Sequence, residues 1–147
     1  GNVPAVTKIQ QRIEINSRMI LTDTPGMMWP KITNELDGIF LAASHSIGIN
    51  AYDEIETALI LSDTLKERYP ESLITCYGFK NPLPSDEEFL GHIAKVRNFI
   101  IKGGKVNLLK AAVTFINDYR NGVIGKISLE SPSSRKLMLE NSQINKK

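Results

Sequence analysis

The sequence predicts a mainly α-helical chain with a short β-hairpin at its N-terminus, and two changes in its hydrophobic pattern support this prediction. Apolar and polar residues alternate through Arg12, Ile13, Glu14 and Ile15, which is the period of a strand. From about residue 35 the apolar residues recur at every third or fourth position, which is the period of a helix. We therefore expect a small helical bundle after the hairpin.

The hairpin is expected to occupy residues 8–23. Asn16 and Ser17 are a turn signal between the alternating segment and a short apolar run, residues 18–23, which ends at Asp23. A hairpin without neighbouring strands has an unpaired edge and an uncovered face. Self-association through that edge is one expected consequence, and disorder of residues 1–34 is the other.

Four helices are expected after the hairpin, because apolar residues lie at helical spacing in four segments. The third segment begins with Ser85, and Glu88 follows three residues later, which is the pattern of a capping box. Pro70 follows the second segment and is expected to mark its end. The predicted helices span residues 35–47, 52–68, 85–101 and 107–120.

The residues after Ser131 are mostly polar, and we expect a flexible tail in which only residues 136–140 suit a turn of helix. The chain then divides into three parts. Residues 1–34 form the edge of a strand-containing domain, residues 35–130 form a helical domain, and residues 131–147 form the tail.

Composition narrows the class of protein. Of the 147 residues, 41% are hydrophobic and 23% charged, which suits a modest globular core. The apolar runs are far shorter than the roughly 20 residues of a membrane span. The single cysteine, Cys76, excludes an internal disulfide and a cysteine-clustered zinc site, and we interpret it as a small buried residue. A reducing, cytoplasmic setting is expected.

Charge is distributed unevenly along the chain. Residues 1–94 hold 7 Lys and Arg against 13 Asp and Glu, whereas residues 95–147 hold 11 against 3. The basic C-terminal third predicts a polyanionic partner, with nucleic acid the first candidate. A solvated basic face with a flexible tail explains the same charge equally well, so composition leaves both interpretations open.

One motif in the sequence carries chemistry. Asp23-Thr24-Pro25-Gly26 directly follows the apolar run of the hairpin. In P-loop nucleotide hydrolases an aspartate at a strand end holds Mg²⁺, and the glycine lets the backbone approach the terminal phosphate. The motif therefore predicts one part of a nucleotide site. Taken alone, the four residues fit an ordinary Pro-Gly turn better.

Thr7 strengthens the nucleotide interpretation. It lies sixteen residues before Asp23, on the other side of the hairpin, where the threonine of a first nucleotide switch would stand. We therefore expect Thr7 and Asp23 to be Mg²⁺ ligands. Together with Thr24, Pro25 and Gly26 they form the predicted nucleotide switch.

Two motifs of ordinary GTPases are missing from the sequence. There is no Gly-x-x-x-x-Gly-Lys-Ser/Thr phosphate-binding loop, and the more than 120 residues after Gly26 contain no Asn-Lys-x-Asp guanine-reading motif. Either the chain is not part of a GTPase, or these motifs lie upstream in permuted order.

Longer stretches around the switch motif resemble a known family. Residues 1–11 and 21–31, the latter with Trp29-Pro30-Lys31 after the switch motif, are similar to the circularly permuted ribosome-biogenesis GTPases of the YlqF/RbgA type. Trp-Pro-Lys after Asp-Thr-Pro-Gly is much more specific than Asp-x-x-Gly alone. The similarity extends to Pro132 and includes Glu67-Arg68-Tyr69-Pro70, Asp118-Tyr119-Arg120, Gly125-Lys126-Ile127 and Leu129-Glu130-Ser131-Pro132.

The resemblance implies that the chain is the C-terminal part of a longer GTPase, from the first switch onward, since that family places its P-loop before the switches. The hairpin is then a remnant of a P-loop α/β GTPase domain. The resemblance also implies Mg²⁺ and GTP as cofactors of the intact protein. Met27 occupies the place of the usual catalytic glutamine, so we assign no catalytic side chain. Ala5 and Lys8 depart from the family's first switch, although Thr7 is kept.

The resemblance further implies that the helical domain contacts ribosomal RNA and that the intact protein assists maturation of the large ribosomal subunit. Basic residues in the folded part of the C-terminal third are expected to neutralise phosphates. Lys102 and Lys105 are the first candidates, because two glycines between them allow a close approach of the backbone to a phosphate. The expected RNA-binding residues are Lys95, Arg97, Lys102, Lys105, Lys110, Arg120 and Lys126.

Some residues keep alternative interpretations. Arg120 could instead pair with Asp118 or cap the C-terminus of its own helix. His45, His92 and Trp29 are interpreted as structural residues.

The leading functional hypothesis is the switch-bearing, RNA-binding part of a ribosome-assembly GTPase, inactive in GTP hydrolysis by itself. The alternative is a stand-alone RNA-binding module without nucleotide chemistry.

Overall fold

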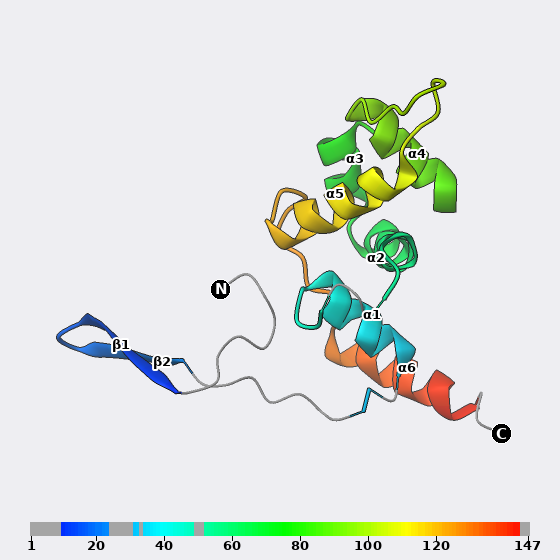
Figure 1. Cartoon of the computed structure of the whole chain (residues 1–147). Coiled ribbons are helices and arrows are strands. Elements are labelled where there is room, and N and C mark those ends of the chain that lie inside the picture. The colour runs from blue at the N-terminus through cyan, green and yellow to red at the C-terminus, as the bar shows by residue number, and fades with distance from the viewer. Residues whose placement is uncertain (1–9, 24–30, 33, 49–51, 145–147) are drawn as a thin grey trace.

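The structure of the chain is a computed structural model that describes residues 10–23, 31–32, 34–48 and 52–144; for Asp23, Glu87, Met138, Leu139 and residues 141–144 it describes the backbone alone. It consists of a two-stranded hairpin and six helices (Figure 1), which agrees with the predicted mainly α fold. The elements are β1 Gln11–Asn16, β2 Met19–Asp23, α1 Glu35–Ala43, α2 Glu54–Arg68, α3 Pro70–Tyr77, α4 Asp86–Val96, α5 Leu108–Arg120 and α6 Pro132–Ile144.

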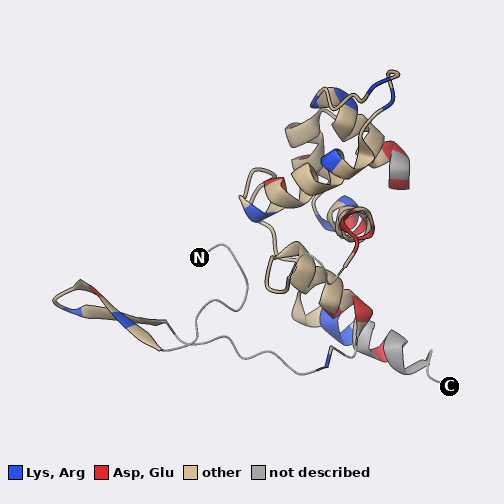
Figure 2. Cartoon of the chain, viewed as in Figure 1, with Lys and Arg blue, Asp and Glu red and all other residues tan. Residues whose placement is uncertain are grey.

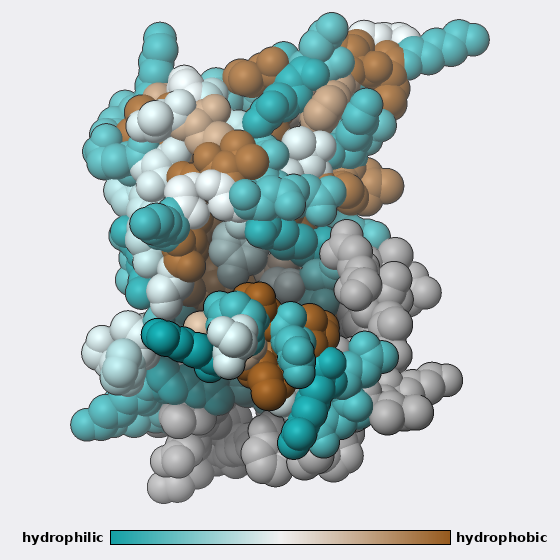
Figure 3. Space-filling model, turned by 90° about the vertical axis from the view of Figure 1, so that its left-hand side faces the viewer, coloured by the Kyte–Doolittle hydropathy of each residue, from teal (hydrophilic) through white to brown (hydrophobic). Residues whose placement is uncertain are grey.

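The two strands of the hairpin pair antiparallel, with Ile13 opposite Leu21 and Gln11 opposite Asp23. Apolar side chains on both strands are about half exposed, such as Ile13 at 49% and Leu21 at 52%. The brown side chains of this hairpin lie open in the lower half of Figure 3, which faces it. The hairpin is therefore formed as the alternation predicted, and its apolar residues are uncovered.

Polar side chains cap three of the helices. Asn34 accepts a hydrogen bond from the Leu36 amide at the start of α1, and Asp53 and Asn107 do the same for α2 and α5. The predicted capping box at α4 is wrong: Ser85 is the N-cap residue, but its side chain makes no capping hydrogen bond.

The sequence does not predict helix α3, because a proline directly after a helical pattern usually marks its end. In the structure Pro70 occupies the first turn of α3, where its missing N–H costs no hydrogen bond and its fixed φ suits a helix. Tyr69 serves as the C-cap of α2 and the N-cap of α3, so one residue separates the two helices.

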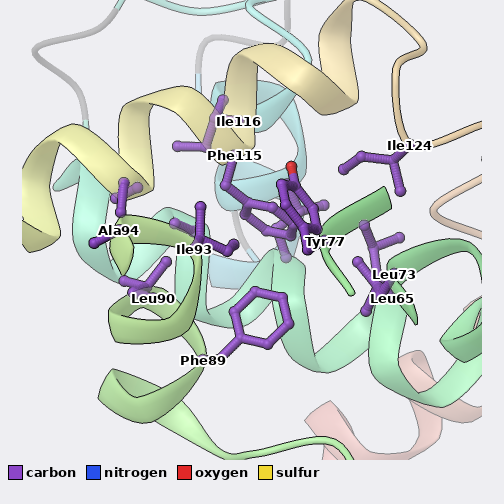
Figure 4. Close-up of a cluster of buried hydrophobic side chains, with 14 of the residues drawn as sticks. Leu65, Leu73, Tyr77, Phe89, Leu90, Ile93, Ala94, Phe115, Ile116 and Ile124 are labelled. Carbon is purple, nitrogen blue, oxygen red and sulfur yellow. The ribbon is translucent and has the colours of Figure 1, made fainter. Parts of the chain in front are cut away.

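The hydrophobic core lies between α2, α3, α4 and α5. Phe89 and Phe115 meet edge to face at 5.2 Å between ring centroids, and Phe79 stacks on Phe89 at 4.6 Å. Each fully buried side chain of this size contributes about 1.5–3 kcal/mol to folding. Figure 4 shows side chains from these helices converging, among them Leu65, Leu73, Tyr77, Phe89, Leu90, Ile93, Phe115 and Ile116.

Residues 132–144 form helix α6, where the sequence predicted a flexible tail with at most one turn of helix. Figure 1 shows α6 running beside α1. Arg135 of α6 forms an ion pair with Asp37 of α1. The polar composition of residues 131–147 does not reveal this contact, because the partner lies far away in the sequence. The remaining predicted boundary, between residues 34 and 35, stays a prediction. Within the described residues, no helix combines the length and apolar character that a membrane span requires.

Candidate nucleotide switch and nucleic-acid interface

Of the predicted nucleotide switch, the structure describes only the backbone of Asp23, at the end of β2. β1 begins at Gln11 and β2 ends at Asp23, and these two residues are paired across the strands. The segment that contains Thr7 enters the hairpin at the end where the segment after Asp23 leaves it. Thr7, Thr24, Pro25 and Gly26 themselves lie outside the described residues, as does Trp29.

The donor atoms of the predicted switch suit Mg²⁺. A threonine hydroxyl and an aspartate carboxylate are hard oxygen ligands, which this ion prefers. Thr7 and Asp23 would supply two such ligands, so other groups must supply the remainder. Among the described residues, no group of three or more His, Cys, Asp or Glu side chains is placed to hold a metal ion.

Basic residues gather at one end of the helical part, around the end of α4 and the loop that leads to α5. Figure 2 shows blue segments on both of these elements. Lys95 lies in the last turn of α4, and Lys102 and Lys105 lie in the loop; all three side chains are exposed. Lys110 follows on α5, with its ammonium 4.5 Å from the centroid of the Phe99 ring. Four of the seven predicted RNA-binding residues thus come from neighbouring elements.

The loop between α4 and α5 is a tight hairpin. The Ile101 amide donates to the Lys105 carbonyl at 2.8 Å, and the Asn107 amide donates to the Phe99 carbonyl at 2.8 Å. Gly103 and Gly104 both have positive φ, 91° and 76°, a conformation that glycine adopts without strain. The two glycines hold Lys102 and Lys105 at the turn, as the sequence suggested.

Arg97 is engaged within the protein. Its guanidinium donates to the Asp118 carboxylate at 2.8 Å and lies over the Tyr77 ring. The Tyr77 hydroxyl donates to the same carboxylate oxygen, also at 2.8 Å. Burial, followed by this hydrogen bond, raises the pKa of Tyr77 well above its ordinary value. Arg97 therefore has a partner within the protein, and a phosphate would have to compete with the Asp118 carboxylate for its guanidinium.

Arg120 is also engaged within the protein, but not as a cap of its own helix, which is the alternative that the sequence predicts. It donates to the carbonyl oxygens of Ala43 at 2.8 Å and Ala42 at 2.7 Å. These carbonyls end α1, so Arg120 caps a helix other than its own, 77 positions away in the sequence. Burial lowers its pKa from the ordinary arginine value. The alternative ion pair with Asp118 is not formed, because Asp118 binds Arg97.

The remaining singled-out residues have ordinary surroundings. Lys126 is exposed in the loop after α5. A ring nitrogen of His92 lies 2.9 Å from the Tyr77 carbonyl oxygen, and its ring stacks on Phe79. Cys76 is partly buried, and burial raises the pKa of its thiol, which disfavours the reactive thiolate. His92 and Cys76 are thus placed as structural residues.

The sequence does not reveal two features of the structure. It does not show the Asp37–Arg135 pair, which no local pattern signals. It also does not show that Ile100 and Ile101, beside the basic turn, are exposed at 47% and 45%. Phe99, Ile100 and Ile101 are three consecutive apolar residues, so the sequence shows no periodicity that would tell which side chain faces the core and which face solvent.

Comparison with known proteins shows similarity to GTPases, as the switch motif suggests. No protein-family model matches the chain. The chain is 33% identical over 132 residues to the ribosome biogenesis GTPase A of Bacillus licheniformis, covering 90% of this chain and 47% of that protein. It is 30% identical over 132 residues to the probable ribosome biogenesis GTPase A of Mycoplasma genitalium, covering 88% of this chain and 46% of that protein.

The chain is also similar, at lower identity, to a eukaryotic protein. The chain is 29% identical over 139 residues to a nuclear GTP-binding protein of Saccharomyces cerevisiae, covering 84% of this chain and 26% of that protein. The chain thus spans about half the length of the bacterial proteins that it matches. Over about 90% of its own length, the chain is thus similar to the ribosome biogenesis GTPase A proteins.

Proposed function

We propose that this chain is the part of a ribosome-assembly GTPase that carries the two nucleotide switches and binds ribosomal RNA of the large subunit. The observation that supports this is the pairing of Gln11 with Asp23, because the two predicted switch segments flank these residues in the sequence. The names of the matched relatives, ribosome biogenesis GTPase A, support the same class of function.

In the intact protein, Thr7 and Asp23 would bind Mg²⁺ through their side-chain oxygens. Thr24, Pro25 and Gly26 would line the terminal phosphate of GTP, with the backbone of Gly26 close to it because glycine has no side chain to obstruct the approach. When bound, Mg²⁺ would neutralise phosphate charge. The chain alone lacks the phosphate-binding loop, so we expect it to bind no nucleotide and to hydrolyse no GTP. Measurable GTP turnover by the 147-residue chain would contradict this.

The RNA-binding part of the proposal concerns the basic end of the helical part. Lys95, Lys102, Lys105 and Lys110 are the residues from which we expect phosphate contacts, and exposed Lys126 extends the set. Arg97 and Arg120 were predicted with them, but both bind groups of the protein, so we assign them a structural role first. Neutralising phosphates releases counterions, so the affinity should fall steeply with salt.

Helix α1 follows the predicted switch segment along the chain and packs against α2 of the helical part. We propose that GTP alters the segment after Asp23 and thereby changes the position of the helices on RNA. The test is the affinity of the intact protein for large ribosomal subunits with a non-hydrolysable GTP analogue and with GDP. We expect the two affinities to differ, and Asp23→Asn to remove the difference. Equal affinities in the unmodified protein would overturn the coupling and leave RNA binding without nucleotide control.

A further inference from the structure

The turn between α4 and α5 presents apolar side chains as well as lysines. We define the α4–α5 tip as residues 99–106. Within it, Phe99 and Val106 pack against the core, whereas Ile100 and Ile101 are about half exposed. About half of each isoleucine side chain therefore remains available for burial against a partner.

Further apolar residues flank the tip. Val96 at the end of α4 is 53% exposed, and Leu109 at the start of α5 is 51% exposed. A single exposed apolar residue is ordinary on a protein surface, but a group of them suggests an interaction site. At the top of Figure 3, where the loop between α4 and α5 lies, brown side chains sit beside long teal ones.

Backbone hydrogen bonds within the chain hold the tip together. Ile100 and Val106 form a β-bridge, and the Gly104 amide donates to the Ile101 carbonyl at 3.1 Å. With the bonds from Ile101 to Lys105 and from Asn107 to Phe99, this small hairpin holds its side chains in place. A preorganised surface loses little conformational entropy on binding.

The combination of charges and apolar groups specifies the partner. Lys102 and Lys105 suit phosphates, and the charge around the tip is complementary to a polyanion. Ile100 and Ile101 gain nothing from phosphates and need an apolar surface. In a regular RNA helix the bases are stacked, the major groove is too narrow for side chains, and the minor groove displays hydroxyls. Only unstacked bases offer an apolar face beside the phosphates.

We propose that the α4–α5 tip recognises RNA with unstacked bases, such as a bulge or a single-stranded loop, and that Ile100 and Ile101 contact those bases while Lys102 and Lys105 bind the adjoining phosphates. This inference rests on the RNA binding proposed above and narrows it from phosphate contact in general to one structural class of RNA.

The test compares two RNAs and two double variants of the full chain. The probes are a fluorescently labelled 20-base-pair RNA duplex and the same duplex with a three-nucleotide bulge. We expect the unmodified chain to bind the bulged RNA roughly tenfold more tightly, on the scale of one base contact. Ile100→Thr with Ile101→Thr should reduce the affinity for the bulged RNA to that for the duplex and leave its salt dependence unchanged. Threonine keeps the β-branched shape that suits the hairpin.

Lys102→Gln with Lys105→Gln should weaken binding to both RNAs by similar factors and reduce the slope of log affinity against log salt by about 2. Val123→Thr is the matched control, since Val123 is 54% exposed but lies after α5. Thermal unfolding of each variant checks that it folds.

The outcomes separate the two proposals. Equal affinity of the unmodified chain for duplex and bulged RNA, or an isoleucine variant that keeps the preference, would overturn this inference while RNA binding stands. Failure of the chain to bind either RNA at low salt would overturn the proposed function, and this inference with it.

Discussion

Arg135 of α6 donates hydrogen bonds from both terminal guanidinium nitrogens to the two carboxylate oxygens of Asp37 on α1, 98 positions away in the sequence. The contact from its second nitrogen measures 3.0 Å, and Glu130 accepts a further bond from Arg135 at 3.2 Å. Arg120 holds the other end of α1 by donating to the carbonyls of Ala42 and Ala43. Helix α1 is thus fixed at both ends by arginines from the C-terminal part of the chain.

The Asp37–Arg135 pair should stabilise the packing of α6 on α1. Both side chains are partly exposed, at 25% and 37%, so solvent screening limits the coupling energy to about 0.5–1 kcal/mol. A double-mutant cycle of Asp37→Asn and Arg135→Gln, measured by urea unfolding, checks this value. Amide hydrogen exchange should accelerate in α6 in each single variant. The pair Asp63–Lys66 within α2 serves as a control, since it joins no two helices. A coupling energy near zero would show that α6 is held in another way.

Replacement of Arg120 by methionine should destabilise the protein by about 1.5–3 kcal/mol, because two carbonyls at the end of α1 lose a charged donor. Methionine keeps much of the apolar stem, so the loss reports on the hydrogen bonds. Lys126→Met at an exposed position should have little effect. The free energy of unfolding in urea is the measurement. Equal losses from the two substitutions would refute the capping role.

Gly38 and Gly91 should respond in opposite ways to alanine. Both lie within helices, where alanine is favoured over glycine by about 1 kcal/mol. A Cβ at Gly91 meets nothing within 4 Å, so Gly91→Ala should be stabilising. A Cβ at Gly38 would lie 1.8 Å from the Tyr52 hydroxyl, so Gly38→Ala must displace the Tyr52 ring and should lose stability.

Thermal unfolding compares the glycine variants. Adding Tyr52→Ser to Gly38→Ala removes the clashing ring, so the double variant should be more stable than Tyr52→Ser alone. If Gly38→Ala alone raised the melting temperature as much as Gly91→Ala, close packing of Tyr52 on α1 would be disproved.

Stability should depend on Tyr77 at high pH. Burial and the hydrogen bond to Asp118 raise the pKa of Tyr77, so the folded state favours the protonated phenol. The unfolded chain loses that proton near the ordinary tyrosine pKa of about 10. The stabilisation is therefore complete below about pH 10 and declines as the pH rises further, by up to about 1.4 kcal/mol per pH unit. Urea unfolding between pH 8 and pH 11 should show a smaller decline in Tyr77→Phe. Parallel curves for the two proteins would contradict the assignment.

Much of the helical architecture follows from the sequence. The helices α2, α4 and α5 lie within segments whose apolar residues are spaced for one buried face, and Gln11 to Asp23 alternates and then turns as a hairpin does. Single residues that usually mark helix ends predict the structure less well, because the same residue type can serve in two roles. Pro70 ends one helix pattern and begins α3, and Ser85 precedes α4 without capping it through its side chain.

The sequence alone also predicts the switch motif, the similarity to ribosome biogenesis GTPases and the basic character of the C-terminal third, because these depend on residue identity and order. The tertiary structure decided which of the basic residues are free to act. Lys102 and Lys105 stand exposed at a turn that two glycines allow, while Arg97 and Arg120 bind Asp118 and the end of α1. These partners lie 21 and 77 positions away along the chain, and only folding brings them together. The exposure of Ile100 beside partly buried Phe99 is likewise a property of packing, since a run of consecutive apolar residues does not reveal which side chains face the core.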